Sequence, residues 1–581
     1  YTRMAYVREN HWKLTHLLNY NQTFYKHDIG MLLGFEEERF VKRTTDTAKL
    51  GLIDSSVGDP SSATTPSSIS GTGEEFTSRS YFGRINYAFD SRYLFEVNMR
   101  YDGSSRFAPD NRWGLFPSFS AGWRISEEKF MKGLPIDNLK LRASWGKLGN
   151  NAIGNYEWQA VYNSAKYAFG GSLNNGLAIT SISNNLLEWE STAITNIGID
   201  FATLRNRLTF EAEFYNKVTD GILYRPDMYM SLGTASGPRQ NIAEVTNRGI
   251  EMTLNWQDRI GKVEYRVSGN FAYNQNKVSK YKGELQRGWV TDENGNRVYQ
   301  TNIGDVSTGG STRVIEGKMI NEYYMLQPYK GNGNGFNADG TVNINGGPRD
   351  GMIRTVDDMK WLNAMVGAGY KFYPRQNVSK SGIWYGDYIY ADLNGDGVYG
   401  NDADNEFQGC SNVPKYNFGL QASANWKGFD FSMNWSGAAG FKIYYYRLAL
   451  NSSATIKGYA IGEAIANDHY FFDPKNPNDP RTNLSSKNPR LTNNSGNDQS
   501  GMTQSSVHLQ KGDYIKLKNL TIGYTLPAVL SKKVYAQNIR FFASGENLFT
   551  ITGYEGMDPE MRTAVGYSTM RQYAFGVNIT F

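Results

Sequence analysis

The sequence predicts an all-β protein: a transmembrane, antiparallel β-barrel with short periplasmic turns and long extracellular loops. Three observations support this fold class. Large apolar residues recur at every second position in many stretches, and the connections between those stretches alternate between short and long. No apolar run approaches the roughly 20 residues that a membrane-spanning helix needs. Because the strands of a membrane barrel hide their apolar residues by alternation, a polar average composition is compatible with this fold.

The alternation is clearest at the C-terminus, in RQYAFGVNITF (571–581). Its large apolar residues are Tyr573, Phe575, Val577, Ile579 and Phe581. A period of two indicates a strand with one apolar face. Chain ends fray unless they are paired, so we expect this strand to lie in a sheet. We also expect Val577 to face lipid and Asn578 to face the lumen.

Fifteen strands of this kind are predicted along the chain. In one of them, Glu96, Asn98 and Arg100 alternate with large apolar residues, so one face suits hydrocarbon and the other suits water. The predicted strands are 12–20, 29–35, 81–89, 93–101, 113–125, 139–145, 197–201, 208–214, 250–256, 263–273, 416–426, 429–435, 513–526, 537–549 and 573–581.

The connections fall into two classes by length, and the two classes alternate. The short connections are 21–27, 90–92, 127–137, 203–206, 257–261, 427–428 and 527–536. The long ones are roughly 38–80, 147–187, 219–245, 275–412 and 437–510, with briefer members at 103–111 and 551–568. Tight turns at one end and long loops at the other are typical of an outer-membrane barrel, whereas a soluble β-sandwich does not segregate its loops by length.

Composition excludes several classes of function. The 61 Lys and Arg residues nearly balance the 56 Asp and Glu residues, and no basic block occurs, so we expect no nucleic-acid partner. A single cysteine, Cys410, excludes a disulfide framework within the chain. No HExxH, P-loop or GxSxG motif is present, and the five His residues are scattered, so we expect no catalysis.

Six stretches carry a resemblance to a known family. They are YFGRINYAFDSRYLFEVNMRYDGSSRF (81–107), FPSFSAGWRISEEKFM (116–131), NRGIEMTLNW (247–256), DLNGDG (392–397), KGDYIKLKNLTIGYTLP (511–527) and ENLFTITGYEGMDPE (546–560). In their order and spacing they resemble the SusC/RagA-type, TonB-dependent outer-membrane importers of Bacteroidota. The resemblance runs from near residue 10 to Phe581.

This resemblance implies a function and a set of partners. Members of the family import oligomeric nutrients, most commonly glycan oligosaccharides and, less often, peptides. A SusD-like surface lipoprotein covers the barrel as a lid. The TonB complex pulls an N-terminal plug out of the barrel lumen to drive transport. The resemblance also implies that Phe581 is a signature read by the barrel-assembly machinery; the alternative is an ordinary aromatic residue at a sheet edge. A passive porin and a barrel-based surface adhesin are the alternative functions.

The predicted strand number is odd, whereas single-chain bacterial barrels of this type have an even number. The first and last predicted strands run in the same direction, so they are not expected to pair. Plugged transporters have about 22 strands. We therefore expect residues 1–581 to be the C-terminal part of the barrel, preceded in the native protein by the plug and about seven further strands.

The segment ADLNGDGVYGNDADNE (391–406) resembles a calcium-binding loop. Oxygen ligands at alternate positions of such a loop converge on the ion, and Gly397 stands where the sharp turn is needed. The predicted ligands are Asp392, Asn394, Asp396, the Val398 carbonyl and, because Ala403 replaces the acid at the twelfth position, Asp402 or Asp404. The alternative is a solvated turn without metal. We expect no required cofactor, but possible Ca²⁺ in loop 392–404.

Aromatic residues are frequent in the longest predicted loop. Flat rings can stack on sugar faces, and tyrosine hydroxyls can bond to sugar rims. The predicted substrate-binding residues are Trp361, Trp384, Tyr385, Tyr388 and Tyr390. The alternative is that these rings pack the loop together or contact a partner protein.

Overall fold

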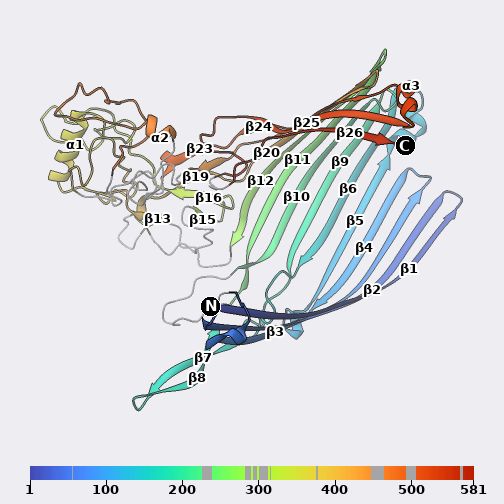
Figure 1. Cartoon of the computed structure of the whole chain (residues 1–581), viewed down its shortest axis with the longest axis horizontal. Coiled ribbons are helices and arrows are strands. Elements are labelled where there is room, and N and C mark those ends of the chain that lie inside the picture. The colour runs from blue at the N-terminus through green and yellow to red at the C-terminus, as the bar shows by residue number, and fades with distance from the viewer. Residues whose placement is uncertain are drawn as a thin grey trace. The chain divides into compact units, whose positions relative to one another are not determined.

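The computed structural model describes residues 1–54, 56–224, 238–281, 289–291, 297–299, 312–313, 316–373, 377–445, 463–492, 505–562 and 567–581. Strands make up most of it (Figure 1). In these ranges no helix is both long enough and apolar enough to cross a membrane.

The elements follow one another along the chain with few helices among them. The strands are β1 (Thr2–Phe24), β2 (His27–Leu52), β3 (Ala63–Phe89), β4 (Tyr93–Ser104), β5 (Trp113–Arg124), β6 (Ile136–Asn150), β7 (Val161–Phe169), β8 (Ser172–Ser181), β9 (Glu190–Thr203), β10 (Leu208–Tyr224), β11 (Gln240–Ile260), β12 (Val263–Tyr281), β13 (Trp289–Thr291), β14 (Arg297–Tyr299), β15 (Thr312–Arg313), β16 (Glu322–Met325), β17 (Lys371–Phe372), β18 (Val398–Tyr399), β19 (Glu406–Ser411), β20 (Tyr416–Trp426), β21 (Phe429–Ala439), β22 (Lys442–Tyr444), β23 (Leu509–Lys511), β24 (Tyr514–Thr525), β25 (Asn538–Thr552) and β26 (Gln572–Thr580). The α-helices are α1 (Val356–Gly367), α2 (Glu463–Asn467) and α3 (Ala528–Ser531).

One large sheet contains fifteen of these strands, in the order β1-β2-β3-β4-β5-β6-β9-β10-β11-β12-β20-β21-β24-β25-β26. The fifteen predicted strands correspond one to one with these, so the strand count is confirmed. β1 and β26 stand at the two ends of this order, and the described strand pairs include none between them, as expected. Sequential neighbours pair throughout the sheet, because each hairpin connection returns the chain beside the strand that it has just left.

The chain divides into two compact units. The first comprises Tyr1–Ile250 and Ser279–Gly283, and the second comprises Glu251–Val278 and Glu284–Phe581. In the first unit, β1 to β6 run side by side as long arrows (Figure 1).

The prediction of a loop at 38–80 is wrong for most of its length. β2 continues to Leu52 and β3 begins at Ala63, and their ladder extends through the pair Lys42↔Glu74. Cross-strand ion pairs such as Arg39 Nη2 to Glu75 Oε1, 2.8 Å, accompany it. A strand needs about 9–11 residues to span a bilayer, and β2 has 26. Beyond the bilayer both faces of a strand meet water, so the apolar alternation disappears although the backbone pairing persists.

The predicted loop at 147–187 also contains structure, the hairpin of β7 and β8. Gly170 and Gly171 both have positive φ, 57° and 79°, which is the backbone geometry that a two-residue hairpin turn requires. Leu173, Leu177 and Tyr162 are exposed on this hairpin. The Gly-Gly pair between alternating stretches was a signal from which the hairpin could have been predicted.

The second unit has a core of its own, built from the predicted loop 275–412 and from residues near 470. Helix α1 contributes to it with the buried residues Met359, Trp361, Leu362 and Met365, which lie on one helical face. Thr355 caps the helix in a capping box with Asp358. This loop is therefore a packed structure and not a solvated tether.

Candidate functional site

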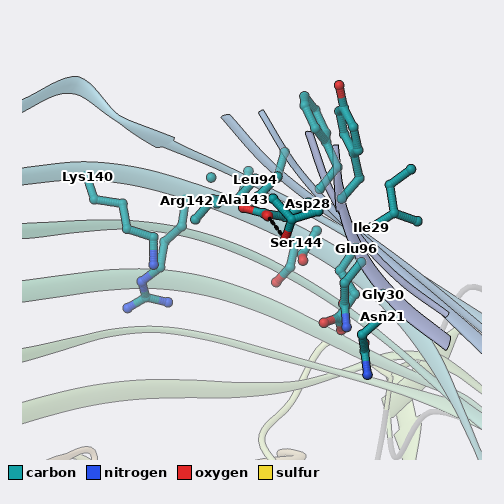
Figure 2. Close-up of a pocket in the computed structure, with 18 of the residues that line it drawn as sticks. Asn21, Asp28, Ile29, Gly30, Leu94, Glu96, Lys140, Arg142, Ala143 and Ser144 are labelled. Carbon is teal, nitrogen blue, oxygen red and sulfur yellow. Dashed lines mark hydrogen bonds between the residues drawn. The ribbon is translucent and has the colours of Figure 1, made fainter. Parts of the chain in front are cut away.

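One face of the strands in the first unit is polar and lines a hollow of about 580 Å³. The pairing register places one residue from each strand in a continuous row, which we call the polar row. Its members are Asn21, Gly30, Asn86, Glu96, Ser120, Ser144 and Asn196. Figure 2 shows Asn21 and Gly30 at one side of the hollow, and Lys140 and Arg142 at the other.

Charged residues next to the polar row are held in a fixed network. Arg142 Nε lies 3.1 Å from Asp200 Oδ1, and its Nη1 lies 2.5 Å from Glu213 Oε2. Lys140 Nζ lies 3.5 Å from Asp200 Oδ2. Gly198 leaves room for this network, because a Cβ there would lie 2.7 Å from the Arg142 guanidinium carbon. The result is a polar wall of paired charges that suits contact with water, polar solutes or a polar protein surface.

The opposite face of the same strands is apolar. The row beside the polar row consists of Met31, Ile85, Val97, Phe119 and Trp145. Met31, Ile85 and Phe119 are each more than 40% exposed within this chain. A continuous exposed face of large apolar side chains is costly in water and favourable in hydrocarbon, so this face suits lipid.

The last strands of the second unit show the same division. Val577 pairs with Phe541, and both side chains are about half exposed. On the other face Asn578 pairs with Arg540, whose guanidinium binds Asp430 through Nε at 2.9 Å and Nη2 at 2.5 Å. The facing predicted for Val577 and Asn578 thus agrees with the nature of their neighbours.

Four of the predicted substrate-binding residues, Trp361, Tyr385, Tyr388 and Tyr390, belong to the buried core of the second unit. Trp361, Tyr388 and Tyr390 are at most 6% exposed. Trp361 stacks on Tyr329 with ring centroids 5.2 Å apart, and its Nε1 donates to the Asn343 carbonyl oxygen at 2.8 Å. Because buried rings offer no free face to a sugar, the structure favours the packing role for these three residues.

The Gly- and Asn-rich segment 331–347 has a structural purpose at this point. A Cβ on Gly347 would lie 2.5 Å from the Trp361 ring, and one on Gly335 would lie 3.2 Å from the Trp361 Cβ. Gly347 also has φ of 71°, which favours glycine. The segment therefore folds closely over the indole, which explains its composition.

Trp384, together with the core residue Tyr385, lines a cavity of about 590 Å³ in the second unit. Trp384 is half-buried, and the buried Tyr385 packs edge-on against it. Sequence reasoning missed the rest of the cavity lining, to which the segment HYFFD (469–473), Arg481 and Arg490 contribute. Its adjacent aromatic residues were a signal, but nothing local to either segment indicates that the two meet.

The calcium-like loop is curled by its own side chains. Asp392 accepts hydrogen bonds from the backbone N–H groups of Gly395, at 2.7 Å, and Gly397, at 2.9 Å. Asp396 accepts from the N–H of Val398 at 2.8 Å, and Asn394 donates to Asp396 at 2.9 Å. The residues that the structure describes contain no cluster of three or more His, Cys, Asp or Glu side chains arranged to hold a metal ion.

Asp404 is fully buried and faces into the loop. Its carboxylate accepts from the backbone N–H groups of Leu393, Gly400 and Asn401 at 2.7–3.1 Å. Burial raises the pKa of Asp404 to about 6, against the lowering effect of these donors. The side chain of Asp402 lies outside the described part of the chain. Calcium binding by Asp392, Asn394, Asp396 and the Val398 carbonyl stays a prediction.

Comparison with known proteins identifies the family. The family model described as "TonB dependent receptor-like, beta-barrel" matches residues 2–548. The chain belongs to this family. Its members are outer-membrane transport proteins and not enzymes, so the predicted fold class and outer-membrane localisation are confirmed.

Individual relatives agree with the family assignment. The receptor is 29% identical to TonB-dependent receptor P39 of Formosa agariphila, over 97% of this chain and 52% of the relative. It is 28% identical to TonB-dependent receptor SusC of Bacteroides thetaiotaomicron, over 86% of this chain and 43% of the relative. The resemblance to SusC/RagA-type receptors is therefore confirmed. The chain spans about half the length of these curated relatives.

Solved structures show the same fold. The RagAB peptide transporter matches all of this chain and 56% of its own, with a TM-score of 0.73 and 22% sequence identity. The RagAB peptide importer in its "open-open" state matches with a TM-score of 0.74 and 21% identity.

Two of the stretches that carry the SusC/RagA resemblance meet in the receptor. Lys516, from β24, is buried, and its Nζ donates to Asp558 Oδ2 and Glu560 Oε2, each at 2.7 Å. Lys518 Nζ lies 2.6 Å from both carboxylate oxygens of Glu560. We call these four residues the lysine–carboxylate cluster. It attaches the loop after β25 to the first residues of β24.

The terminal residue Phe581 follows β26 directly and is 79% exposed. Its exposure leaves the ring accessible in this chain. Its role as an assembly signature stays a prediction.

Proposed function

We propose that the protein of which this chain is a part actively imports oligomeric nutrients across the outer membrane. Glycan oligosaccharides are the expected cargo, and peptides come second. The observation that supports this proposal most strongly is the match of residues 2–548 to the TonB-dependent receptor barrel family. The polar row and the ion network beside it support it further, because a hydrophilic cargo needs a hydrated lumen wall.

The proposal includes two partners. The TonB complex supplies energy through a plug N-terminal to this chain, and a SusD-like lipoprotein covers the long extracellular loops. The relatives' greater length, about twice that of this chain, is consistent with such a plug. No catalysis is part of the proposal.

Growth and uptake measurements test it. We expect deletion of the gene to abolish growth on one class of oligosaccharide, and deletion of tonB to abolish uptake of the same cargo. A co-encoded surface lipoprotein should copurify with the receptor. Uptake that persists without TonB would favour a passive porin. Unchanged uptake combined with lost surface attachment would favour an adhesin. If the deletion abolishes only peptide uptake, peptides and not glycans are the cargo.

A further inference from the structure

The cavity in the second unit lies between two segments that are distant in sequence. With a volume of about 590 Å³ it falls within the range of small-ligand sites. The first segment contributes Lys380, Trp384 and Tyr385. The second contributes the segment 469–473 and, further along, Arg481, Asn483 and Arg490.

Three aromatic rings hold one another in fixed orientations along the wall of this cavity. Trp384 and Tyr385 meet at 5.2 Å with ring planes at 80°, and Tyr385 and Phe472 meet at 5.1 Å and 77°. Tyr385 is buried, whereas Trp384 and Phe472 are half-buried. Edge-to-face packing against a buried ring fixes the Trp384 indole without covering it fully.

The two arginines that line the cavity are each paired with a carboxylate of the protein. Arg490 binds Asp387 through Nε at 2.8 Å and Nη2 at 2.9 Å. Arg481 binds Asp479 through Nε at 3.0 Å and Nη2 at 2.8 Å. Because each guanidinium already has a carboxylate partner, an anionic ligand gains little from them.

His469 and Asn483 add hydrogen-bonding groups to the same wall. His469 Nδ1 donates to the Ile465 carbonyl oxygen at 3.0 Å, which orients the imidazole ring. Asn483 is held by its donation to Asp468 at 3.0 Å. Fixed aromatic faces with charge-compensated hydrogen-bonding groups at the rim suit a ligand that has an apolar face and hydroxyl edges.

We infer that this cavity is a binding site for an uncharged sugar residue of a glycan chain. The sugar ring stacks on Trp384, and its hydroxyls bond to His469 and to the arginine–carboxylate pairs at the rim. This inference rests on the proposed import of oligosaccharides and adds a site in the long extracellular loop. It favours neutral glycans over acidic glycans, because both arginines of the cavity wall already bind carboxylates and the wall also carries the carboxylate of Asp473.

Calorimetry with the full-length receptor, purified in detergent, tests the inference. The probes are maltohexaose, mannohexaose and xylohexaose as neutral sugars, hexagalacturonate as an acidic sugar, and an uncharged hexapeptide. We expect one of the neutral hexasaccharides to bind, and Trp384→Ala to weaken that binding about tenfold. Trp384→Phe should retain most of the affinity because it keeps a ring. The matched control is Tyr373→Ala, which removes an exposed ring of the same unit that does not line the cavity.

Three results would overturn the site: no binding of any neutral hexasaccharide, equal affinities for wild type and Trp384→Ala, or tighter Trp384-dependent binding of hexagalacturonate or the peptide. Uptake in cells separates this inference from the proposed function. Oligosaccharide uptake without Trp384-dependent binding would overturn the site alone. Trp384-dependent binding without any oligosaccharide uptake would support the site and overturn the proposed function.

Discussion

Replacing Lys516 by methionine should release the loop after β25 from the start of β24. Lys516 Nζ is the buried cation that bonds to both Asp558 and Glu560 at 2.7 Å. In the variant Glu560 keeps Lys518 at 2.6 Å, but Asp558 is left buried without a cation. Removing one partner of a buried ion pair costs about 3–5 kcal/mol, because the remaining charge stays desolvated. The opening of residues 553–562 should become easier by that amount.

Hydrogen exchange of the full-length receptor measures this effect. The backbone amides of 553–562 should exchange on the order of 10²–10⁴-fold faster in Lys516→Met than in wild type. The matched control is Lys518→Met, two residues along the same strand. Its side chain is 31% exposed and Glu560 keeps Lys516, so the expected cost is about 0–1 kcal/mol. Equal acceleration in both variants, or none in Lys516→Met, would refute the reasoning.

The pH dependence of the same exchange provides a second check. Burial acts to raise the pKa of Asp558, but hydrogen bonds from Lys516 and Thr569 outweigh it and hold that pKa below its usual value. The pKa of Glu560 is likewise lowered, because Lys516 and Lys518 outweigh its burial. Carboxyl groups with lowered pKa values stabilise the fold above their unfolded pKa, about 4, and lose that effect as the pH falls through the folded value. After correction for intrinsic rates, exchange should be constant from about pH 8 to 5 and should accelerate only below about pH 4.

Three further outcomes are expected. Val577→Arg should destabilise the assembled barrel by about 2–4 kcal/mol if residue 577 lies near the bilayer midplane, whereas Asn578→Arg should be tolerated. Heat-shift electrophoresis of the assembled receptor compares the two variants, and equal effects would contradict the predicted facing. Calcium chelation should speed hydrogen exchange in loop 392–404, and Asp396→Ala should reproduce that effect. An exchange rate that chelator does not change would argue against calcium binding. Trp361→Ala should destabilise the core of the second unit by about 3–5 kcal/mol and make it sensitive to protease, and resistance equal to wild type would contradict its packing role.

The strands of the large sheet could be predicted from the sequence because their signal is local. Each residue of a membrane strand meets either hydrocarbon or water, and neighbouring residues meet opposite environments. The alternation at Tyr573–Phe581 therefore indicates both the strand and its facing. Where water surrounds both faces of a strand, apolar and polar residues no longer alternate. The part of β2 from Glu38 to Leu52 therefore lacks the strand signal, and the sequence predicts a loop there.

The long loop obeys no such local rule. Trp361, Trp384 and Tyr388 are all aromatic residues in one polar stretch, yet Trp361 and Tyr388 are buried and Trp384 lines a cavity. Whether each of these rings is buried or lines the cavity depends on segments far away in sequence. The Tyr388 hydroxyl donates to the Lys487 carbonyl oxygen, and Arg490 binds Asp387, more than 100 positions away. Lys516 and Asp558 likewise meet only in the folded chain. The sequence by itself determined the strands, because each of their residues meets either hydrocarbon or water. Only the tertiary structure decided which loop residues are buried, because the apolar environment in the loops is made by other parts of the same chain.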